Sequence, residues 1–329
     1  METPPTPQPT LENPDPTRGG ASRAVAPLLL ALAFSLSAFS VYGYLDASSA
    51  APSSQQAAAT SALPALPRLP DIELDAQSAI VVDMASGATL FERNADVQLP
   101  LASITKAALV LAVSEVLPLD SLITVGSTIP PTGTTGALPS GSVWRVQDII
   151  DFTLAGSSNE GAELLARAAD EPLRARYSAA PVGSAAVWRM DEIARERGLH
   201  DMYFLNPSGL DESATQSGGY GSARSVAALF AYAASAHAEV FTATARKEVT
   251  ITSQEGRAVV ASNTDDALDA IPGIVLGKTG YTDLAGGNLA VVFDTGGHRI
   301  VAVVLGSTKD GRFSDMRALV AGVQKSIGR

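Results

Sequence analysis

The stretch L-A-S-I-T-K at residues 101–106 sets a hydroxyl, Ser103, three positions before an amine, Lys106. The residues that follow are apolar or small, and no charge appears until Glu115. This run predicts a buried helix over residues 103–117. In a helix, positions i and i+3 lie on one face about 5–6 Å apart at Cβ. Ser103 and Lys106 should therefore present a hydroxyl and an amine to the same place.

The position of Lys106 at the start of so apolar a segment suggests a catalytic role for its amine. Pro100 places the helix start close to Ser103, where unsatisfied backbone N–H groups favour a developing anion. Desolvation should lower the pKa of the lysine, and a neutral amine can accept the serine proton. The alternative is a lysine that serves only solubility, and S-x-x-K alone does not exclude it.

A second polar element, G-S-S-N at residues 156–159, lies at a break between two expected helices. It can be a polar loop with an N-cap, since Ser and Asn are common there. It can also aim a hydroxyl and an amide into a site. In that interpretation Ser157 relays a proton between Lys106 and a leaving amine, and Asn159 holds a substrate amide.

A third element, Lys278-Thr279-Gly280, ends an apolar strand and is followed by Tyr281. A strand that simply ends in a turn is one interpretation. In the other, the cation and hydroxyl bind a substrate carboxylate, and Gly280 lets a ligand approach the backbone closely. An extended peptide could also pair along the edge of such a strand.

The remaining pattern predicts an α+β domain whose first and last strands share an antiparallel sheet. Thr295-Gly296-Gly297-His298 is a good hairpin turn between the last two strands. Ser222 is the expected N-cap of one helix, and Gly198 is the expected end of another. The expected strands are 78–84, 88–93, 274–281, 289–295 and 299–306, and the expected helices are 103–117, 147–155, 160–169, 185–197, 222–236 and 313–327.

The order S-x-x-K, then S-x-N, then K-T-G is far more specific than any one of the three motifs. With it, the sequence resembles the serine D-alanyl-D-alanine carboxypeptidases, which are low-molecular-mass penicillin-binding proteins of the peptidase S11 type. The resemblance runs from about Ala79 to Gly328. It includes IVVDMASGATLFERNADVQLPLASITK at 80–106, FLNPSGLD at 204–211, YGSARSVAALF at 220–230 and GKTGYTDLAGGNLA at 277–290.

The resemblance implies a β-lactamase/DD-transpeptidase-like fold, with a central antiparallel sheet of about five strands flanked by helices and a mainly helical subdomain. It implies that Ser103 is the acylated nucleophile and Lys106 its general base. Ser157 and Asn159 would form the second motif, catalytic and substrate-binding respectively. This chain has S-S-N there, where many carboxypeptidases have S-G-N and many β-lactamases S-D-N.

The same resemblance assigns the strand motif to the substrate. Lys278 and Thr279 would hold the substrate carboxylate, with Gly280 beside them. The backbone N–H groups of Ser103 and Tyr281 would form the oxyanion hole. No metal and no other cofactor is implied.

The implied reaction removes the terminal D-Ala from peptidoglycan stem peptides through an acyl-enzyme on Ser103, with β-lactams as inhibitors. A D,D-endopeptidase that cuts cross-links is the alternative within the class, and a β-lactamase is another. A non-catalytic wall-binding module is the alternative outside it. Glu160 and Glu163 follow the second motif closely, and neither is assigned as a separate deacylating base.

The N-terminal region predicts a membrane anchor. Residues 24–45 contain no charged residue, and roughly 20 apolar residues cross a hydrocarbon core of about 30 Å. Arg18 and Arg23 precede the segment, which predicts a cytoplasmic N-terminus and an extracytoplasmic catalytic domain on a bacterial cell membrane. The expected organisation is a disordered cytoplasmic tail at 1–23, a transmembrane signal-anchor at 24–45, a flexible linker at 46–70 and the catalytic domain at 71–329.

Two alternatives bear on this anchor. Small residues at 48–50 would suit signal cleavage, and the protein would then be secreted. Many family members instead continue into a second β-rich domain and a C-terminal amphipathic anchor. The N-terminal segment is expected to replace that anchor here.

Charge and composition exclude several classes of function. The 329 residues have a formal net charge of −11 and show no basic patch with interleaved aromatics, so nucleic acid is not an expected partner. The absence of cysteine excludes thiol catalysis, disulfides and thiolate metal sites. The three histidines have no metal-binding spacing and stand at His200, His237 and His298.

Overall fold

The structure, a computed structural model, describes residues 64–126 and 138–328. The expected tail, the expected membrane span and residues 46–63 of the expected linker lie outside the described residues. Within the described part, no single helix is both long and apolar enough to cross a membrane. One pair of helices, Ala223–Ala236 with Ala238–Ala245, meets the length and composition criteria together but is bent by 107°.

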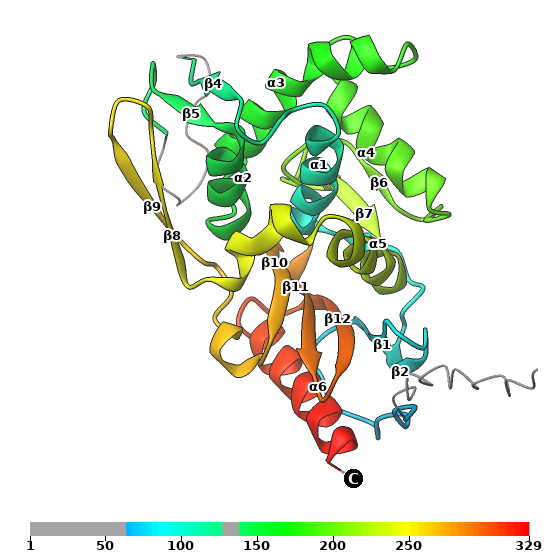
Figure 1. Ribbon diagram of the computed structural model, residues 1–329. Helices are drawn as coiled ribbons and strands as arrows, with labels where there is room; N and C mark the ends of the chain where they lie inside the picture. The colour runs from blue at the N-terminus through cyan, green and yellow to red at the C-terminus, as the bar shows by residue number, and fades with distance from the viewer. Residues whose placement is uncertain (1–63, 127–137, 329) are drawn as a thin grey trace, which may run out of the picture. The chain divides into compact units, whose positions relative to one another are not determined.

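A five-stranded antiparallel sheet joins the two ends of the described chain, as predicted. Its strand order is β10-β11-β12-β1-β2 (Figure 1). Gly296 and Gly297, both at positive φ (56° and 84°), turn β11 into β12 as the G-G pair predicted. The strands are β1 (Ser78–Asp83), β2 (Thr89–Arg93), β10 (Ile274–Thr282), β11 (Gly286–Thr295) and β12 (His298–Ser307).

Both faces of this sheet are buried, which explains why its strands are continuous apolar runs. Along β12, Val301 and Val303 face one core, and Ile300 and Ala302 face the other. One face is covered by α6 (Gly311–Ile327) and the other by α5 (Ala223–Ala236) (Figure 1). Alternate residues of one strand therefore belong to two separate hydrophobic cores.

A mainly helical part lies on the α5 side of the sheet, as expected. Its centre is α1 (Thr105–Ser114), in which every residue from Thr105 to Val113 is buried. A helix that is apolar all round needs cover on every side. That cover comes from α2 (Val146–Ala155), α3 (Asn159–Arg176), α4 (Ala185–Glu196) and α5.

Two predicted helices differ from the structure at their ends. The expected helix 103–117 splits into a 3-10 turn, η1 (Ala102–Ile104), and the shorter α1. The third helix continues past its expected end at residue 169 and through Pro172, with Leu173 buried beneath it. Packing of this apolar residue holds the helix together where proline removes one backbone hydrogen bond.

Three small sheets and two 3-10 segments were not predicted from the sequence. Among these, β8 and β9 form a hairpin beside α2, with alternating burial along β8. The segments are β3 (Leu99–Pro100), β6 (Tyr203–Phe204) and β7 (Gly219–Gly221); β4 (Leu122–Thr124) and β5 (Val143–Arg145); β8 (Glu248–Thr252) and β9 (Ala258–Ser262); and the 3-10 segments η2 (Ala238–Ala245) and η3 (Leu268–Ala270).

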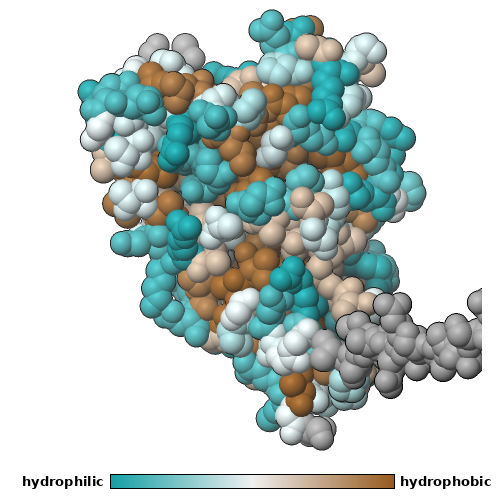
Figure 2. All heavy atoms as spheres, in the orientation of Figure 1, coloured by the Kyte–Doolittle hydropathy of each residue, from teal (hydrophilic) through white to brown (hydrophobic). Residues whose placement is uncertain are grey.

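The packed domain extends into the range expected to be linker. Leu69 is buried against the α6 core, and its N–H donates to the Leu90 carbonyl at 2.8 Å. Residues just before 71 therefore belong to the fold rather than to a spacer. On the face shown in Figure 2, polar and apolar residues are interspersed in small groups.

Candidate active site

Ser103 and Lys106 meet at the junction of η1 and α1. Lys106 Nζ lies 2.7 Å from Ser103 Oγ. The serine is partly exposed, whereas the lysine side chain has no exposed surface. The i, i+3 spacing thus joins the two groups as the sequence predicted, although Ser103 stands on the 3-10 turn rather than inside the α-helix.

Lys106 is surrounded in a way that suits a neutral amine. Its Nζ lies 2.7 Å from Asn159 Oδ1 and 2.7 Å from the Ser208 carbonyl oxygen. Burial, and next the positive charge of Lys278, hold the pKa of Lys106 well below its ordinary range. A neutral amine has two N–H donors and one lone pair. Asn159 and Ser208 can take the two donors, which leaves the lone pair for the Ser103 hydroxyl.

The backbone around Ser103 is held in an unusual conformation. Ala102 has φ 49°, a left-handed value that non-glycine residues adopt only when the surroundings impose it. Gly280 lies against this turn, so a Cβ there would stand 2.8 Å from the Leu101 carbonyl oxygen and 3.2 Å from Ser103 N. A Cβ on Gly209 would collide with the Ala102 carbonyl. Two glycines from distant segments therefore allow the turn at residues 101–103 to pack closely between them.

Ser157 and Lys278 form a second serine–lysine contact. Ser157 lies between α2 and α3 at φ 56°, and its Oγ accepts a hydrogen bond from Lys278 Nζ at 2.8 Å. From sequence, Ser157 is expected to relay a proton between Lys106 and a leaving amine; its contact with Lys278 was not predicted. Lys278 is buried and also donates to the Thr279 carbonyl at 2.9 Å. Burial, and next the charge of Arg312, lower its pKa to about 7.

The other residues of the strand motif stand beside Lys278. Thr279 Oγ1 lies 2.5 Å from Thr264 Oγ1, which fixes the threonine side chain. The Gly280 carbonyl accepts from Arg312 Nη1 at 2.6 Å. Tyr281 is 44% exposed, and Lys309 Nζ lies 5.6 Å from its ring centroid. On β10, the ammonium of Lys278 and the hydroxyl of Thr279 are therefore buried, whereas the ring of Tyr281 is partly exposed to solvent.

Arg312 and Asp265 add buried charge behind this strand. Both side chains are buried, and Arg312 Nε and Asp265 Oδ2 lack a hydrogen-bond partner among the described residues. Arg312 lowers the pKa of Lys278 and Asp265 opposes that effect. Arg312 and Lys278 supply positive charge at this end of β10, and Asp265, Asp266 and Asp310 act on Arg312 from its other sides.

Sequence reasoning gave no role to several groups of this site. Ser208 belongs to the F-L-N-P-S-G-L-D stretch, whose N-P-S-G letters signal a turn but not a carbonyl aimed at a lysine. Arg312 reaches Gly280 from the start of α6, 32 residues along the chain, and no local pattern marks it. Thr264 is likewise an ordinary loop residue in sequence.

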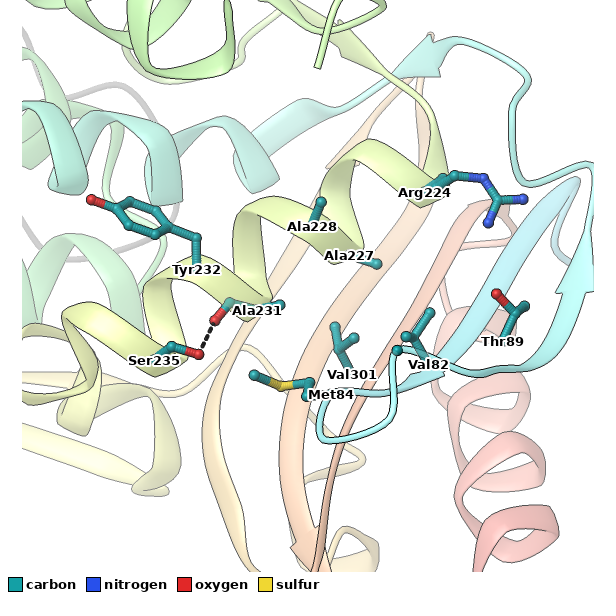
Figure 3. A pocket seen from close by; sticks show the side chains of 11 residues that line it. Val82, Met84, Thr89, Arg224, Ala227, Ala228, Ala231, Tyr232, Ser235 and Val301 are labelled. Atoms are coloured by element: carbon teal, nitrogen blue, oxygen red, sulfur yellow. Dashed lines mark hydrogen bonds between the residues drawn. The ribbon is translucent and has the colours of Figure 1, made fainter. Parts of the chain in front are cut away.

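Other features of the described residues lie apart from this constellation. No three His, Asp or Glu side chains there converge as metal ligands. An apolar groove of about 470 Å³ runs between α5 and the strands β1, β2 and β12 (Figure 3). Its walls include Val82, Ala227 and Val301, and it shares no residue with the site on β10.

The fold places a serine beside a buried lysine, with a second serine–lysine contact and a strand that carries a lysine nearby. These features, with the S-x-x-K, S-x-N and K-T-G motifs, define a serine acyl-transfer enzyme. The chain belongs to the peptidase S11 family of D-alanyl-D-alanine carboxypeptidases, whose family model matches residues 61–309.

Three similar proteins agree with this family. The D-alanyl-D-alanine carboxypeptidase DacB2 of Mycobacterium tuberculosis is 29% identical over 240 residues, which cover 72% of this chain and 77% of that protein. A D-alanyl-D-alanine endopeptidase of Pseudomonas aeruginosa is 32% identical over 142 residues, 42% of each chain. The crystal structure of penicillin-binding protein D2 from Listeria monocytogenes, with cefotaxime bound, is 26% identical with a TM-score of 0.65, covering 77% of this chain and 99% of that one.

Proposed function

We propose that this protein is a serine D-Ala-D-Ala carboxypeptidase that removes the terminal D-Ala from peptidoglycan stem peptides. The observation that carries the proposal is the 2.7 Å contact between Lys106 Nζ and Ser103 Oγ, made by a lysine whose other two partners are acceptors. Every step of the reaction uses side-chain and backbone groups of this chain.

Acylation begins when Lys106 takes the Ser103 proton and Oγ attacks the carbonyl carbon of the D-Ala-D-Ala bond. Charge then develops on the carbonyl oxygen. The backbone N–H groups of Ser103 and Tyr281 are the proposed donors to it, because Gly280 brings β10 against the nucleophile turn. Loss of one such donor typically costs about 2.7–4 kcal/mol of transition-state stabilisation.

Collapse of the tetrahedral intermediate breaks the C–N bond and leaves an ester on Ser103. The departing nitrogen needs a proton, which originates on Lys106 and passes to it directly or through the Ser157 hydroxyl. Ser157 accepts from Lys278, so its own proton is free to point towards the leaving amine. Water then attacks the ester, with Lys106 again as the base, and releases the shortened peptide.

The terminal carboxylate of the substrate is the proposed partner of the β10 cation. Lys278 and Thr279 would bind it directly, and Arg312 would strengthen the positive field from behind. A carboxylate held at this end also fixes which amide bond faces Ser103. Charge-assisted hydrogen bonds of this kind are about twice as strong as neutral ones.

The test is incubation of the protein with a pentapeptide that ends in D-Ala-D-Ala, with product masses recorded. We expect loss of one alanine residue and its release as free D-Ala, and no product from Ser103→Ala. A cross-linked peptide dimer should be offered in parallel, because the similarity to a D-alanyl-D-alanine endopeptidase supports that second activity. Cleavage of the dimer alone would replace the carboxypeptidase proposal.

β-Lactams are the proposed inhibitors. Their strained amide mimics the scissile bond, and their carboxylate can reach the Lys278 end of the site. The similar penicillin-binding protein from Listeria monocytogenes holds cefotaxime in its crystal structure, which supports the same behaviour here.

We also propose that residues 24–45 tether the catalytic domain outside the cell membrane. The proposal rests on sequence: the segment is uncharged, and Arg18 and Arg23 precede it. Protease added to intact cells should digest only residues beyond about 46. Recovery of a soluble mature protein starting near Ala51 would show instead that the segment is a cleaved signal.

A further inference from the structure

Two tyrosine rings stack on the small sheet formed by β3, β7 and β6. The ring centroids of Tyr203 and Tyr220 lie 5.2 Å apart, with an interplanar angle of 23°, and Tyr203 is 39% exposed. We propose that Tyr203 and the neighbouring Asp191 form a surface that binds a sugar ring of the glycan strand that carries the stem peptide. The inference rests on the proposed function and extends it from the peptide to the polysaccharide.

The strand register places both rings on the side of this sheet that faces away from the core. Tyr203 pairs with Tyr220, and Tyr220 pairs with Pro100, so the three side chains lie in a row across one face. The next residue along β6, Phe204, points to the opposite face and is buried in the core around α1. The period of two therefore leaves a row of apolar rings on the outside.

The row ends at Tyr203, because β6 is an edge strand of the sheet. Tyr220 stacks on one side of the Tyr203 ring, and no other aromatic ring of the described residues lies against it. Tyr220 is itself held in place, since its hydroxyl accepts from the Ser217 N–H at 2.8 Å. A ligand ring that stacks on Tyr203 would thus meet a support that is already ordered, which lowers the entropic cost of binding.

A carboxylate lies beside the exposed ring. Asp191, on α4, accepts from the Phe204 N–H at 2.8 Å and so lies next to the peptide bond that joins Tyr203 to Phe204. This bond is made by Oδ1, and Oδ2 forms no hydrogen bond to the described residues. Burial raises the pKa of Asp191 to about 6, because one N–H replaces only part of the lost hydration. A hydroxyl or amide N–H of a ligand would supply the missing donor.

An aromatic face beside an available carboxylate oxygen suits a sugar. A pyranose ring carries C–H groups on its face, which can pack on an aromatic ring, and hydroxyl groups on its rim, which can donate to a carboxylate. An uncharged sugar also suits a chain with a formal net charge of −11, which disfavours a second copy of the same chain at this surface.

The surface lies within reach of a substrate bound at Ser103. Two strand spacings of about 4.8 Å separate Pro100 from Tyr203, and the three residues from Pro100 to Ser103 span at most about 11 Å. Tyr203 is therefore within about 20 Å of the nucleophile. A stem peptide is joined to its sugar at the first residue, and four extended residues before the bond to be cut span about 13–14 Å. With the linking lactyl group, one molecule can reach both places.

The first experiment compares two substrates that end in the same pentapeptide: the free peptide, and the peptide carried on a peptidoglycan tetrasaccharide. We expect kcat/KM of the full-length protein to be about 2–10-fold higher for the glycan-linked substrate, the size of one aromatic contact. Equal values for the two substrates would overturn the surface.

Variants assign the preference to the two side chains. Tyr203→Ala should bring the ratio of the two kcat/KM values close to one, and Tyr203→Phe should keep it, because the ring remains. Asp191→Asn should lower the ratio, since the amide can still accept from Phe204 but loses the second acceptor. Leu122→Ala is the matched control: it removes a 54% exposed apolar side chain on β4 and should leave the ratio unchanged.

Binding of a sugar without peptide separates the surface from the reaction. The probe is chitotetraose, a tetramer of β-linked N-acetylglucosamine, observed by saturation-transfer NMR. We expect transfer to the sugar from the wild type and its loss in Tyr203→Ala. Such binding without turnover of any peptide would leave the surface standing and overturn the carboxypeptidase proposal. Turnover of both substrates with equal kcat/KM and no sugar binding would do the reverse.

Sedimentation at the NMR concentration tests the other occupant of this surface, a second copy of the chain. We expect the mass of the wild type and of Tyr203→Ala to be the same. A smaller mass for Tyr203→Ala, with sugar binding unchanged, would assign the rings to an interface between copies and overturn the glycan proposal.

Discussion

Two serine–lysine pairs lie near each other in this molecule and are built in opposite ways. Ser103 and Lys106 come from one helical turn, three residues apart, with Nζ 2.7 Å from Oγ. Ser157 and Lys278 come from a helix junction and a strand, 121 residues apart, with a nearly equal distance of 2.8 Å. Both lysines are buried, and burial is the main cause of the lowered pKa of each.

The two pairs differ in the groups that surround each lysine. Lys106 has a side-chain oxygen and a carbonyl for its N–H groups, which suits a neutral base. Lys278 keeps a pKa of about 7 beside Arg312, which suits a cation that an arriving carboxylate can stabilise. Proximity of serine to lysine therefore does not by itself define a nucleophile. We therefore propose that the first pair transfers protons and that the second binds the charge of the substrate.

Removing each serine in turn tests most directly whether the two pairs have different roles. Ser103→Ala should abolish covalent labelling by a β-lactam, because no other group takes the place of its Oγ. Ser157→Ala should only slow labelling, since the nucleophile and its base remain. Intact-protein mass spectrometry should show one adduct on the wild type, mapping to the peptide that holds L-A-S-I-T-K. An adduct that survives Ser103→Ala would sink the assignment.

The persistence of that adduct separates two enzymes of the same class. Glu160 accepts from the Leu138 N–H at 3.3 Å, and Glu163 lines a cavity between α3 and the start of α4. Neither carboxylate makes a hydrogen bond to Ser103 or Lys106 among the described residues. We therefore expect a long-lived ester. Rapid release of hydrolysed β-lactam would indicate a β-lactamase instead.

Removing the amine of Lys106 should give the next largest effect. Lys106→Met keeps much of the buried volume and deletes the base, so acylation should slow by about 10²–10⁴-fold, the usual contribution of general-base help. The measurement is the rate of β-lactam adduct formation, with thermal unfolding as the control for folding. A folded variant that acylates at the wild-type rate would assign the base elsewhere.

How much of this site was predictable depends on where its contacts come from. The Ser103–Lys106 contact follows from local helical spacing, and the G-G turn and apolar runs of β11 and β12 predicted the sheet. The Lys106 contact with Ser208 spans 102 residues, and no local pattern encodes it. The contact of Ser157 with Lys278 spans 121 residues and was not predicted, for the same reason. Periodicity reports which residues are buried, but only the packed topology decides which buried groups meet.

The small strands were missed for a related reason. Strands β3, β6 and β7 have two or three residues each, too few for a period of two to emerge. The hairpin β8–β9 does alternate, with Val249 and Ile251 buried between exposed neighbours. The alternation in E-V-T-I-T is therefore a strand signal, but it is weaker than the continuous apolar runs of the longer strands.

Deleting the cation of the second pair should have a smaller and more selective effect. Lys278→Ala should lower kcat/KM for free-acid peptides by about 10–100-fold, the range of a hydrogen bond to a charged group. The same peptides as C-terminal amides should lose much less, because they bring no carboxylate to β10. Steady-state kinetics on matched acid and amide pairs checks this, and the amide corrects for any general damage to the fold. Equal losses on both would place the role of the lysine elsewhere.

The smallest predicted effect is in the pH dependence, and it separates the two lysines without mutation. The ordinary lysine pKa of 10.5 falls to about 7 at Lys278. As pH rises through 7 in the free enzyme, Lys278 loses its proton and with it the charge that binds carboxylate. The kcat/KM for acid peptides should therefore fall above pH 7, by at most tenfold per pH unit, whereas the amide should lack this descending limb. If Lys106 is the neutral base that we propose, its titration should appear as a rising limb shared by both substrates.

The free energy of unfolding should also depend on pH through the titration of Lys278. Between about pH 7 and 10.5 the unfolded chain keeps the Lys278 proton that the folded protein has released. The unfolded state then binds more protons, so this lysine makes the free energy of unfolding rise with pH across that window. Lys278→Met should flatten the rise, as measured by denaturant unfolding at pH 6.5 and 9.5. Lys278→Met could instead leave unchanged both the slope of unfolding free energy against pH and the fall of kcat/KM above pH 7. That result would show that Lys278 stays protonated in the folded protein, so that a charged Lys278 and a neutral Lys106 would distinguish the two pairs at neutral pH.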